Sequence, residues 1–396
     1  MKNSWTPGTP VESNAYNWED EPVLTRAKSP QDDHGPTMVD LFSGCGGFST
    51  GFAQAGVQSL LALDIHPPSL ATLAHNHPHT DTLLGDMRRV SDLDMLEAVA
   101  GRRIDVVSAG VPCQGFSRTN RKRWDGDERN FLFEEFVRMV RLLRPPAVLL
   151  ENVSGIKTAA RGDFVRAIAS AIEESGYRVE ARVLNAADHG VPQKRQRIFF
   201  VGLRPEFDIR WPAATFGIDS VPHRSVWDAI GDLPQIGPGE AANEYDAEPE
   251  TDFQRLMRKE AGPLLNHIAP KHPQEVIDKI AGTPPGEPMY PRFKQRIRLH
   301  PDRPSPTQVC GGIRPQFQFG HPTMPRGLTV RERCRIQSFP DHYMITGGTV
   351  QGRVQTGNAV PPLLAQAVAE QILGALRGLP ADASADQPQA AQLVLL

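Results

Sequence analysis

The feature that most constrains this fold is a series of short apolar runs between residues 37 and 208, each followed by glycine or an acidic residue. Such runs precede Gly44, Asp64, Gly85 and Glu151, and helix-like segments separate them. Strands that alternate with helices predict a doubly wound, mostly parallel α/β sheet. Because the carboxyl ends of parallel strands meet at one edge of a sheet, the polar residues that follow them are expected to share one crevice.

Cys113 follows another of these runs, residues 104–108, in the stretch DVVSAGVPCQGFSR. Pro112 has a fixed φ and biases Val111 toward extended geometry, so the thiol is held in a defined direction on a turn at a strand end. That position suits a nucleophile. A buried, inert cysteine is the commoner fate of a free thiol, and the Pro-Cys pair taken alone leaves both interpretations open.

A glycine-rich loop follows the first run, in MVDLFSGCGGFSTGFAQAG at residues 38–56. Glycine allows a backbone to approach a ligand closely, although this spacing is not the GxGxxG of dinucleotide folds. Asp64 ends the next run about twenty residues after the loop, where α/β nucleotide sites place a carboxylate on ribose hydroxyls. Asp86 follows the third run. Either aspartate alone is better explained by a solvated cap, but together with Cys113 they favour one shared site.

Three later segments carry further polar residues. Glu151 ends an apolar run beside Asn152, and a partly buried carboxyl group suits proton transfer because burial raises its pKa toward neutrality. Arg195 and Arg197 alternate before another run, so we expect both to point to one face of a strand; a charged edge that prevents strand pairing is the alternative. The segment GNAVPP at residues 357–362 precedes a predicted helix with an apolar face at positions 364, 368, 372 and 376.

In their order and letters, DLFSGCGG, GVPCQGFSR, ENVSGI, QKRQR and GNAVPP closely resemble the motifs of the DNA cytosine-5 methyltransferase family, in its prokaryotic restriction-modification type. The resemblance covers residues 37–208 and 303–376. It implies transfer of a methyl group from S-adenosyl-L-methionine to carbon 5 of a cytosine that is flipped out of a specific duplex DNA sequence. A tRNA cytosine-5 methyltransferase of the same fold is the alternative. A non-catalytic DNA-binding relative would have lost Cys113 or Glu151.

The catalytic residues that the resemblance implies are Cys113, Glu151, Arg195 and Arg197. Cys113 would attack carbon 6 of the cytosine as a thiolate. Glu151 would contact ring nitrogen 3 and the exocyclic amine. Arg197 would hold oxygen 2, with Arg195 as a supporting neighbour.

The same resemblance implies a binding site for S-adenosyl-L-methionine. Phe42 would lie against the adenine, Asp64 would bind the ribose and Asp86 the adenine amine, while the glycine loop surrounds the methionine portion. Ile65 stands where the family often has a larger aromatic residue. The full set of implied cofactor-binding residues is Phe42, Ser43, Gly44, Cys45, Gly46, Gly47, Asp64, Ile65, Asp86, Met87, Pro112, Asn358 and Val360.

Binding of double-stranded DNA requires local basic patches, because the net charge of -3 gives no overall positive surface. One candidate patch directly follows the nucleophile, and a second lies in residues 209–302, which no family motif covers. We expect the second patch to read the target sequence, whereas a solvated charged surface is the alternative for both. The first patch comprises Gln114, Ser117, Arg118, Arg121 and Arg123, and the second comprises Arg292, Lys294, Arg296 and Arg298.

The 396 residues exceed one ordinary domain. We expect a catalytic domain over residues 37–208, completed by 354–377, and a smaller target-recognition domain with a hinge over 209–345. The polar residues 1–36 are expected to form a mobile arm, and residues 378–396 a disordered tail.

The four cysteines have neither disulfide nor metal spacing, which together with a nucleophilic thiol indicates a reducing compartment. No apolar run reaches membrane-spanning length, and the N-terminus has no signal-peptide pattern. We therefore expect a cytoplasmic, nucleoid-associated, monomeric prokaryotic enzyme that binds no metal. A cognate restriction endonuclease that acts separately is the expected protein partner.

Overall fold

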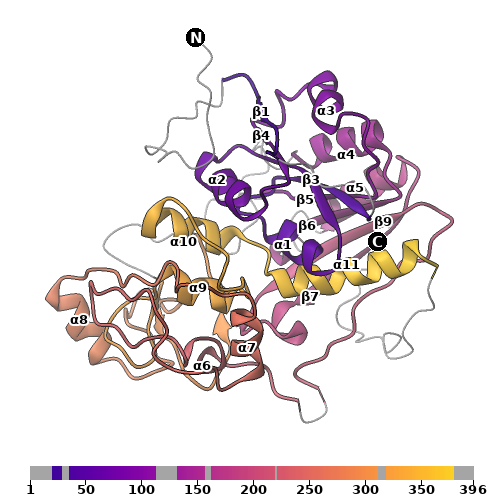
Figure 1. Ribbon diagram of the computed structural model, residues 1–396. Coiled ribbons are helices and arrows are strands. Elements are labelled where there is room, and N and C mark those ends of the chain that lie inside the picture. The colour runs from indigo at the N-terminus through magenta and orange to yellow at the C-terminus, as the bar shows by residue number, and fades with distance from the viewer. Residues whose placement is uncertain are drawn as a thin grey trace. The chain divides into compact units, whose positions relative to one another are not determined.

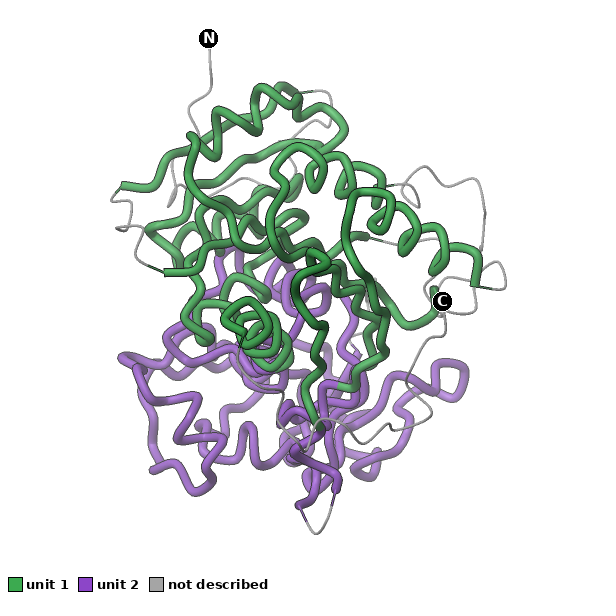
Figure 2. The backbone as a smooth tube through the Cα atoms, turned by 90° about the vertical axis from the view of Figure 1, so that its right-hand side faces the viewer, with its two compact units in different colours: residues 1–185, 196–213, 364–396 green, residues 186–195, 214–363 purple. Residues whose placement is uncertain are grey.

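The chain forms two compact units in the computed structural model, which describes residues 20–28, 35–112, 132–156, 162–218, 221–310 and 318–378. Each unit is assembled from segments that are far apart in the sequence (Figure 2). Unit 1 holds Met1–Asn185, Gln196–Ala213 and Leu364–Leu396, and unit 2 holds Ala186–Arg195 and Ala214–Leu363.

Unit 1 is built on one sheet. In its described residues, eight strands run in the order β1-β4-β3-β2-β5-β6-β9-β7 (Figure 1). The neighbours from β4 to β6 are parallel, while β1, β9 and β7 are antiparallel to their neighbours, so the predicted mostly parallel sheet is confirmed. The strands are β1 (Val23–Thr25), β2 (Thr37–Leu41), β3 (Gln58–Asp64), β4 (Asp81–Leu84), β5 (Val106–Gly110), β6 (Ala147–Val153), β7 (Arg178–Asn185) and β9 (Gln196–Leu203).

The order of the strands reverses at β2. From β2 the chain runs outward through β3 and β4, and then returns to the other side of β2 to form β5 and β6. In doubly wound folds, ligands bind outside the carboxyl ends of the strands at such a reversal. Helices flank the sheet (Figure 1), namely α1 (Gly47–Gln54), α2 (Pro67–Asn76), α3 (Asp92–Val99), α4 (Leu132–Leu143), α5 (Asp163–Glu173) and α11 (Pro362–Leu376).

The central strands of unit 1 are buried and mostly apolar, as expected for parallel strands that helices cover. One residue of each central strand shows this, because Val39 in β2, Leu61 in β3, Val107 in β5 and Leu150 in β6 are all 0% exposed. Helix α4 adds an apolar stripe at helical spacing, with Phe136 and Val140 fully buried. These residues belong to one continuous apolar core. Each strand and helix that contributes to this core therefore carries an apolar pattern that can be recognised in the sequence.

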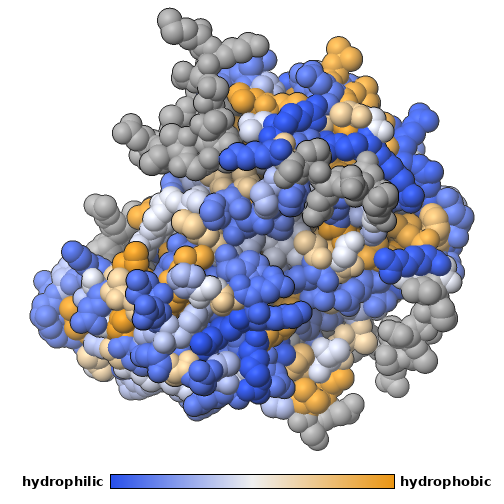
Figure 3. Space-filling view, viewed as in Figure 1, coloured by the Kyte–Doolittle hydropathy of each residue, from blue (hydrophilic) through white to orange (hydrophobic). Residues whose placement is uncertain are grey.

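Helix α11 has the apolar face predicted from the sequence, because Leu364, Val368 and Ile372 are at most 1% exposed. Within the described chain, Gly348–Leu376 is the one stretch that is long and apolar enough to cross a membrane by length and composition alone. Its most apolar window is 61% buried within the protein, and core helices of globular proteins pass the same test. On the face drawn in Figure 3, apolar residues form small groups among hydrophilic ones.

Residues 20–28, which lie in the predicted N-terminal arm, are joined to the sheet of unit 1. Strand β1 pairs antiparallel with β4, with Val23 opposite Leu84. Arg26 donates to Asp81 Oδ2 at 2.9 Å, and the backbone N–H of Ala27 donates to Asp81 Oδ1 at 2.7 Å. Three residues are too few to show a strand period, so pairing at the sheet edge determines this strand rather than local pattern.

Unit 2 consists of short elements. Its two-residue strands pair as β8 (Gln193–Lys194) with β11 (Ser305–Pro306) and β10 (Ile297–Arg298) with β12 (Phe319–Gly320). Helices α6, α7 and α9 each begin with a capping box, in which a Ser or Thr side chain and the third helical side chain satisfy each other's backbone N–H groups. The helical elements are η4 (Ala186–His189), α6 (Val226–Ile230), α7 (Asp252–Arg258), α8 (Gln274–Ala281), α9 (Val330–Ile336) and α10 (Gly348–Asn358).

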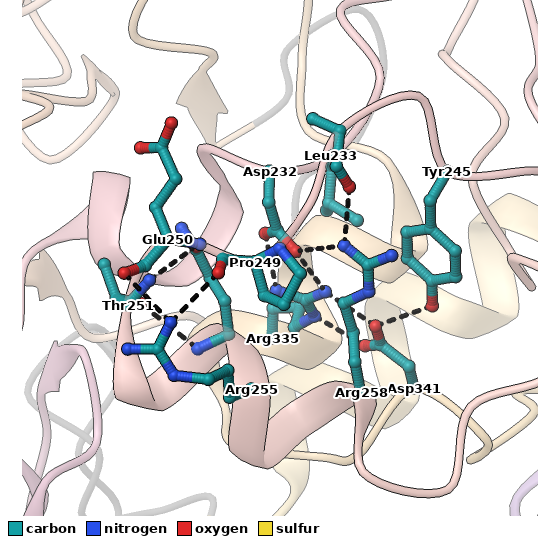
Figure 4. Close-up of polar contacts among 12 residues, drawn as sticks. Asp232, Leu233, Tyr245, Pro249, Glu250, Thr251, Arg255, Arg258, Arg335 and Asp341 are labelled. Atoms are coloured by element: carbon teal, nitrogen blue, oxygen red, sulfur yellow. Dashed lines mark hydrogen bonds and ion pairs between the residues drawn. The ribbon is translucent and has the colours of Figure 1, made fainter.

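Buried ion pairs reinforce the apolar core of unit 2. Arg335, at 0% side-chain exposure, donates to Asp232 Oδ1 at 2.9 Å and to Asp341 Oδ2 at 2.6 Å (Figure 4). Tyr245 donates to the same Asp341 oxygen at 2.7 Å, and the guanidinium of Arg258 lies 3.9 Å from the centre of the Tyr245 ring. A buried charge is costly unless it is paired and hydrogen-bonded, and these charges meet both conditions.

The limits of the units differ from the predicted domain limits at three places, one of which is residues 209–213, expected in the recognition domain but part of unit 1. Residues 186–195, expected in the catalytic block, belong to unit 2 because β8 pairs with β11. Residues 354–363, also expected there, belong to unit 2, where α10 packs on α9. Neither segment carries a strong hydrophobic period, so tertiary pairing decides which unit it joins.

Candidate active site

The predicted strand ends of unit 1 lie side by side at one edge of the sheet. In the register, Leu41 of β2 pairs with Ala109 of β5, and Gly110 of β5 pairs with Glu151 of β6. A Cβ atom added at Gly110 would lie 3.6 Å from the carbonyl oxygen of Phe42 and 3.8 Å from Glu151 Oε2. The glycine loop, the end of β5 and Glu151 are therefore neighbours.

The glycine loop makes a tight turn between β2 and α1. Phe42, Gly44 and Gly46 have φ values of 54, 54 and 84°, a region that glycine adopts without strain. The backbone N–H of Gly44 donates to Asp64 Oδ2 at 2.7 Å, and a Cβ atom at Gly44 would meet nothing within 4 Å. Ser43 Oγ is buried and has no hydrogen-bond partner among the described residues. A buried polar atom left in this state beside an open backbone fits a polar ligand.

Asp64 and Ile65 stand at the end of β3. The two oxygens of Asp64 accept from the backbone N–H groups of Gly44 and His66, each at 2.7 Å. Burial raises the pKa of Asp64, which these hydrogen bonds only partly oppose. A carboxylate oxygen can accept a second hydrogen bond, as a ribose diol would require. Ile65 is 43% exposed and offers an apolar surface next to this carboxylate.

Asp86 follows β4 and is already engaged within the chain. Its carboxylate forms an ion pair with Arg88 at 2.6 Å. Burial pushes the pKa of Asp86 upward, but the hydrogen bonds and charge of Arg88 more than offset this, so its pKa is lowered. Met87 beside it is buried. The expected contact of Asp86 with an adenine amine would add one more hydrogen bond to this carboxylate, and it stays a prediction.

A buried ion pair joins Glu151 of β6 to Arg197 of β9. Arg197 Nε lies 2.8 Å from Glu151 Oε1, and the two side chains are only 12% and 10% exposed. Burial lowers the pKa of Arg197, which the charge of Glu151 opposes, and an arginine in a protein stays protonated. The pair therefore places a fixed donor beside a fixed acceptor near the carboxyl end of β6, in surroundings with little competing water.

Pro112 is the last described residue before the predicted nucleophile. Asn152 donates to the carbonyl oxygen of Val111 at 3.4 Å, which ties this turn to the end of β6. Cys113 lies outside the described residues, and so do the predicted DNA-binding residues Gln114, Ser117, Arg118, Arg121 and Arg123.

Arg195 and Arg197 do not share one strand face, contrary to their alternation in the sequence. Strands β8 and β9 are separate, and Arg195 falls between them in unit 2. It is 1% exposed and donates to the carbonyl oxygens of Gln308 at 2.8 Å and Gly357 at 2.9 Å. Its guanidinium thus holds backbone segments of unit 2 together, and these contacts lend no support to its predicted catalytic role.

The other predicted cofactor residues divide between the units. Cys45 and Gly47 are buried around the start of α1 in unit 1. Asn358 is exposed at the end of α10 and Val360 is buried, both in unit 2. Just before them, a Cβ atom at Gly357 would lie 2.2 Å from the backbone nitrogen of Cys310. Glycine is therefore required at that position by close packing rather than by a special φ.

The predicted basic patch of unit 2 contains two kinds of residue. Arg292 and Lys294 are exposed, and the guanidinium of Arg296 lies 4.7 Å from the centre of the Phe293 ring. Arg298 instead donates to backbone carbonyl oxygens in residues 280–283 and 321–323. Arg298 is thus a structural residue, and the first three remain candidates for contacts with DNA.

Asp40 of β2 is a buried carboxylate that sequence patterns do not single out. It is 0% exposed and accepts hydrogen bonds from the Ser49 and Ser108 side chains and from the Ser49 backbone. Burial raises the pKa of Asp40 to about 6 despite these hydrogen bonds. The available signal was a charged residue inside an otherwise apolar central strand, where no position faces water.

Comparison with known proteins agrees with this geometry. The C-5 cytosine-specific DNA methylase family matches residues 36–374. The chain belongs to this family. The type II methyltransferase M1.HphI of Haemophilus parahaemolyticus is 37% identical to the methylase over 349 residues, covering 85% of this chain and 86% of its own. M.DdeI of Desulfomicrobium norvegicum is 36% identical over 367 residues, with coverages of 85% and 88%.

Solved structures show the same fold as the methylase. An Escherichia coli prophage protein assigned as a DNA modification methyltransferase aligns with a TM-score of 0.73 at 24% identity, over 86% of this chain and 99% of its own. The Dnmt2 methyltransferase of S. pombe aligns with a TM-score of 0.56 at 16% identity. The methylase is a DNA (cytosine-5)-methyltransferase of a family that depends on S-adenosyl-L-methionine, and the relatives favour this over a tRNA enzyme.

Proposed function

We propose that this enzyme methylates carbon 5 of a cytosine flipped out of a specific duplex DNA sequence, with Cys113 as a covalent nucleophile. The observation that carries the proposal is the buried pair of Glu151 and Arg197 beside the end of β5. A flipped base is read along its Watson–Crick edge, and that edge of cytosine carries an acceptor oxygen, a ring nitrogen and an amine. A carboxylate next to a guanidinium is complementary to this edge.

Each residue then has one task in the reaction. Arg197 donates to oxygen 2 of the cytosine, and Glu151 holds a proton at ring nitrogen 3 and accepts from the exocyclic amine. This withdraws electrons from carbon 6, to which the Cys113 thiolate adds. Carbon 5, now part of an enamine, would take the methyl group from the sulfonium of the bound donor, which would be left as a thioether. A base or a water then removes the proton from carbon 5, and the Cys113 thiolate leaves by elimination.

The residues of unit 1 fit S-adenosyl-L-methionine, which supplies an electrophilic methyl group when it is bound. Asp64 would accept from the ribose hydroxyls, while Ser43 Oγ and the glycine-loop backbone would bind the polar methionine portion. Ile65 would cover one face of the adenine. The tasks proposed for Phe42 and Asp86 rest on the resemblance, as do those of Asn358 and Val360.

We assign recognition of the DNA sequence to unit 2, supported by the exposed Arg292 and Lys294 in a stretch that the family motifs leave unmatched. Since the relatives named above are type II methyltransferases, we propose that this enzyme protects DNA in a restriction-modification system. It would act as a monomer in the prokaryotic cytoplasm, at the nucleoid, and its cognate endonuclease would act separately.

Trapping of the covalent intermediate tests the proposal. Fluorine at carbon 5 cannot leave as a proton, so duplex DNA with 5-fluorocytosine at the target should form a stable adduct with the enzyme. We expect an adduct for the wild type and none for Cys113→Ser, on denaturing gels and by mass spectrometry. An adduct mapped to Cys45, Cys310 or Cys334 would contradict the assignment. Label transfer from methyl-labelled S-adenosyl-L-methionine to duplex DNA, with none to total tRNA, tests the substrate.

A further inference from the structure

Asp40 connects two elements of unit 1 that the proposed reaction needs to hold together. Ser49 lies in the first turn of α1, directly after the glycine loop, and Ser108 lies in β5, which leads to Pro112. Asp40, Ser49 and Ser108 are all 0% exposed. Asp40 Oδ2 accepts from Ser49 Oγ at 2.7 Å and from the Ser49 N–H at 3.2 Å, and Oδ1 accepts from Ser108 Oγ at 2.9 Å.

Helix α1 depends on Asp40 at its N-terminus. Its own N-cap residue, Gly46, makes no side-chain cap. The first N–H groups of a helix have no partner within the helix, and a side-chain oxygen usually satisfies one of them. Here that oxygen comes from a neighbouring strand, and its negative charge also suits the positive end of the helix dipole. The glycine loop is thus anchored on one side by Asp64 and on the other by Asp40.

The connection lies where the strand order reverses. Asp40 and Ser108 are directly paired in the register of β2 and β5. These are the two strands whose carboxyl ends carry the glycine loop and the turn at Pro112. A change at Asp40 would therefore alter the spacing of those two ends without touching either of them.

We propose that Asp40 is a positioning residue that fixes the glycine loop relative to β5, and thereby the methyl donor relative to the attacking carbon. This rests on the proposed function, in which the loop holds the donor and β5 leads to the nucleophile. A misplacement of about 1 Å at a reacting centre costs on the order of 100-fold in rate, so a small slip between these elements is enough to be measured.

Two substitutions at position 40 test the hydrogen bonds. Asp40→Ala should weaken binding of S-adenosyl-L-methionine by about tenfold in calorimetry and lower kcat on the order of 100-fold, because the helix cap and the connection to β5 are both lost. Asp40→Asn keeps the shape, since its oxygen can accept from Ser49 and its amide can donate to the Ser108 hydroxyl. It should restore both values to within about threefold of wild type, a change of less than about 1 kcal/mol.

Substitutions of the serines separate the two ends of the connection. Ser49→Ala should mainly raise KM for S-adenosyl-L-methionine, whereas Ser108→Ala should mainly lower kcat. The matched control is Ser59→Ala, because Ser59 of β3 is also buried and its hydroxyl has no hydrogen-bond partner among the described residues. It should leave both constants unchanged. All values are referred to the folded fraction of each variant, measured by circular dichroism.

The proposal is overturned if Asp40→Ala lowers stability but leaves KM and kcat of the folded fraction unchanged. It is also overturned if Asp40→Asn loses as much cofactor affinity and kcat as Asp40→Ala. Serine variants that affect KM and kcat equally would also overturn it. A wild-type enzyme that binds S-adenosyl-L-methionine but methylates no duplex DNA would defeat the proposed function instead, and the calorimetric comparison at position 40 would still stand.

Discussion

Each unit contains a fully buried carboxylate, and the two are stabilised in opposite ways. In unit 1, Asp40 has hydroxyls and one backbone N–H around it, and burial raises its pKa to about 6. In unit 2, burial also acts on Glu332, but Arg326 donates to both of its oxygens and the pKa is lowered to about 2. The acid of unit 1 can therefore change its protonation near neutrality, while that of unit 2 is a lasting charge.

The two cores also differ in how far they rely on apolar packing and on buried charges. Unit 1 has a large continuous apolar core between sheet and helices, and its polar residues gather at the strand ends. The apolar cluster around α6, α7 and α9 in unit 2 is smaller, and buried arginines bonded to carboxylates and backbone carbonyls hold its loops. We infer that unit 2 should be the more sensitive of the two to the loss of a single charge.

The largest effect is expected when the network of Figure 4 is broken. Arg335→Met leaves Asp232 and Asp341 buried without their main counter-ion, which should lower the free energy of unfolding by about 3–5 kcal/mol. Urea denaturation measures this. Arg255→Met is the comparison variant: Arg255 is exposed, pairs with the exposed Asp252 and donates to the carbonyl oxygens of Pro249 and Glu250, so its loss should lower the free energy of unfolding much less than the loss of Arg335 (Figure 4). Equal losses for both variants would remove the contrast between the cores.

A chemical change in unit 1 should affect rate more than binding. Glu151→Gln should lower methyl transfer by about 10²–10³-fold, because the proton at ring nitrogen 3 is no longer held, while affinity for S-adenosyl-L-methionine is kept. Asp64→Ala should show the converse and weaken cofactor binding first. Calorimetry together with single-turnover kinetics separates the two, and a reversed pattern would exchange their assigned tasks.

The two buried acids should respond to pH in opposite directions. The pKa of Asp40 is raised from 3.8 to about 6, so its contribution to stability is lost as the pH rises through 6. The free energy of unfolding of Asp40→Asn should therefore rise relative to that of the wild type, by up to about 3 kcal/mol between about pH 4 and 7. The pKa of Glu332 is lowered, so its contribution is lost as the pH falls toward 2, and the deficit of Glu332→Gln should grow as the pH rises from about 2 to 5. Urea midpoints across pH measure both, and parallel curves would refute the comparison.

The smallest effect is expected at the exposed basic residues of unit 2. Arg292→Ala should weaken DNA binding by less than about 1 kcal/mol and reduce the slope of log K against log salt by about 1, if the side chain contacts a phosphate. Arg298→Ala should instead lower stability, because its guanidinium bonds backbone carbonyls. A salt slope that changes for Arg298→Ala and not for Arg292→Ala would reverse their assignment.

Sequence patterns predicted the sheet of unit 1 well because each central strand is an apolar run with a recognisable end. Gly110 and Glu151 lie at neighbouring strand ends, and Asp64 ends β3 on the other side of β2. Strand β1 escaped prediction because it exists only through its pairing with β4.

Polar side chains were harder to place. Alternation suggested that Arg195 and Arg197 act together, but a break between β8 and β9 sends Arg195 into the framework of unit 2. The pattern shows Asp40 only as a charged residue inside an apolar strand, and its role depends on Ser108, which lies 68 residues away in the sequence. The environment of such polar side chains depends on contacts with residues far away in the sequence, which a local hydrophobic pattern does not show.

Strand β1 also bears on how the protein behaves in concentrated solution. It covers β4, whose edge would otherwise present a row of unpaired N–H and carbonyl groups to other molecules. Arg26 fastens it further by donating to the carbonyl oxygens of Ala98 and Glu97. Residues 20–28 thus cover the outer side of β4, and we predict that shortening the chain from its N-terminus past Ala27 would expose this strand as a template for aggregation.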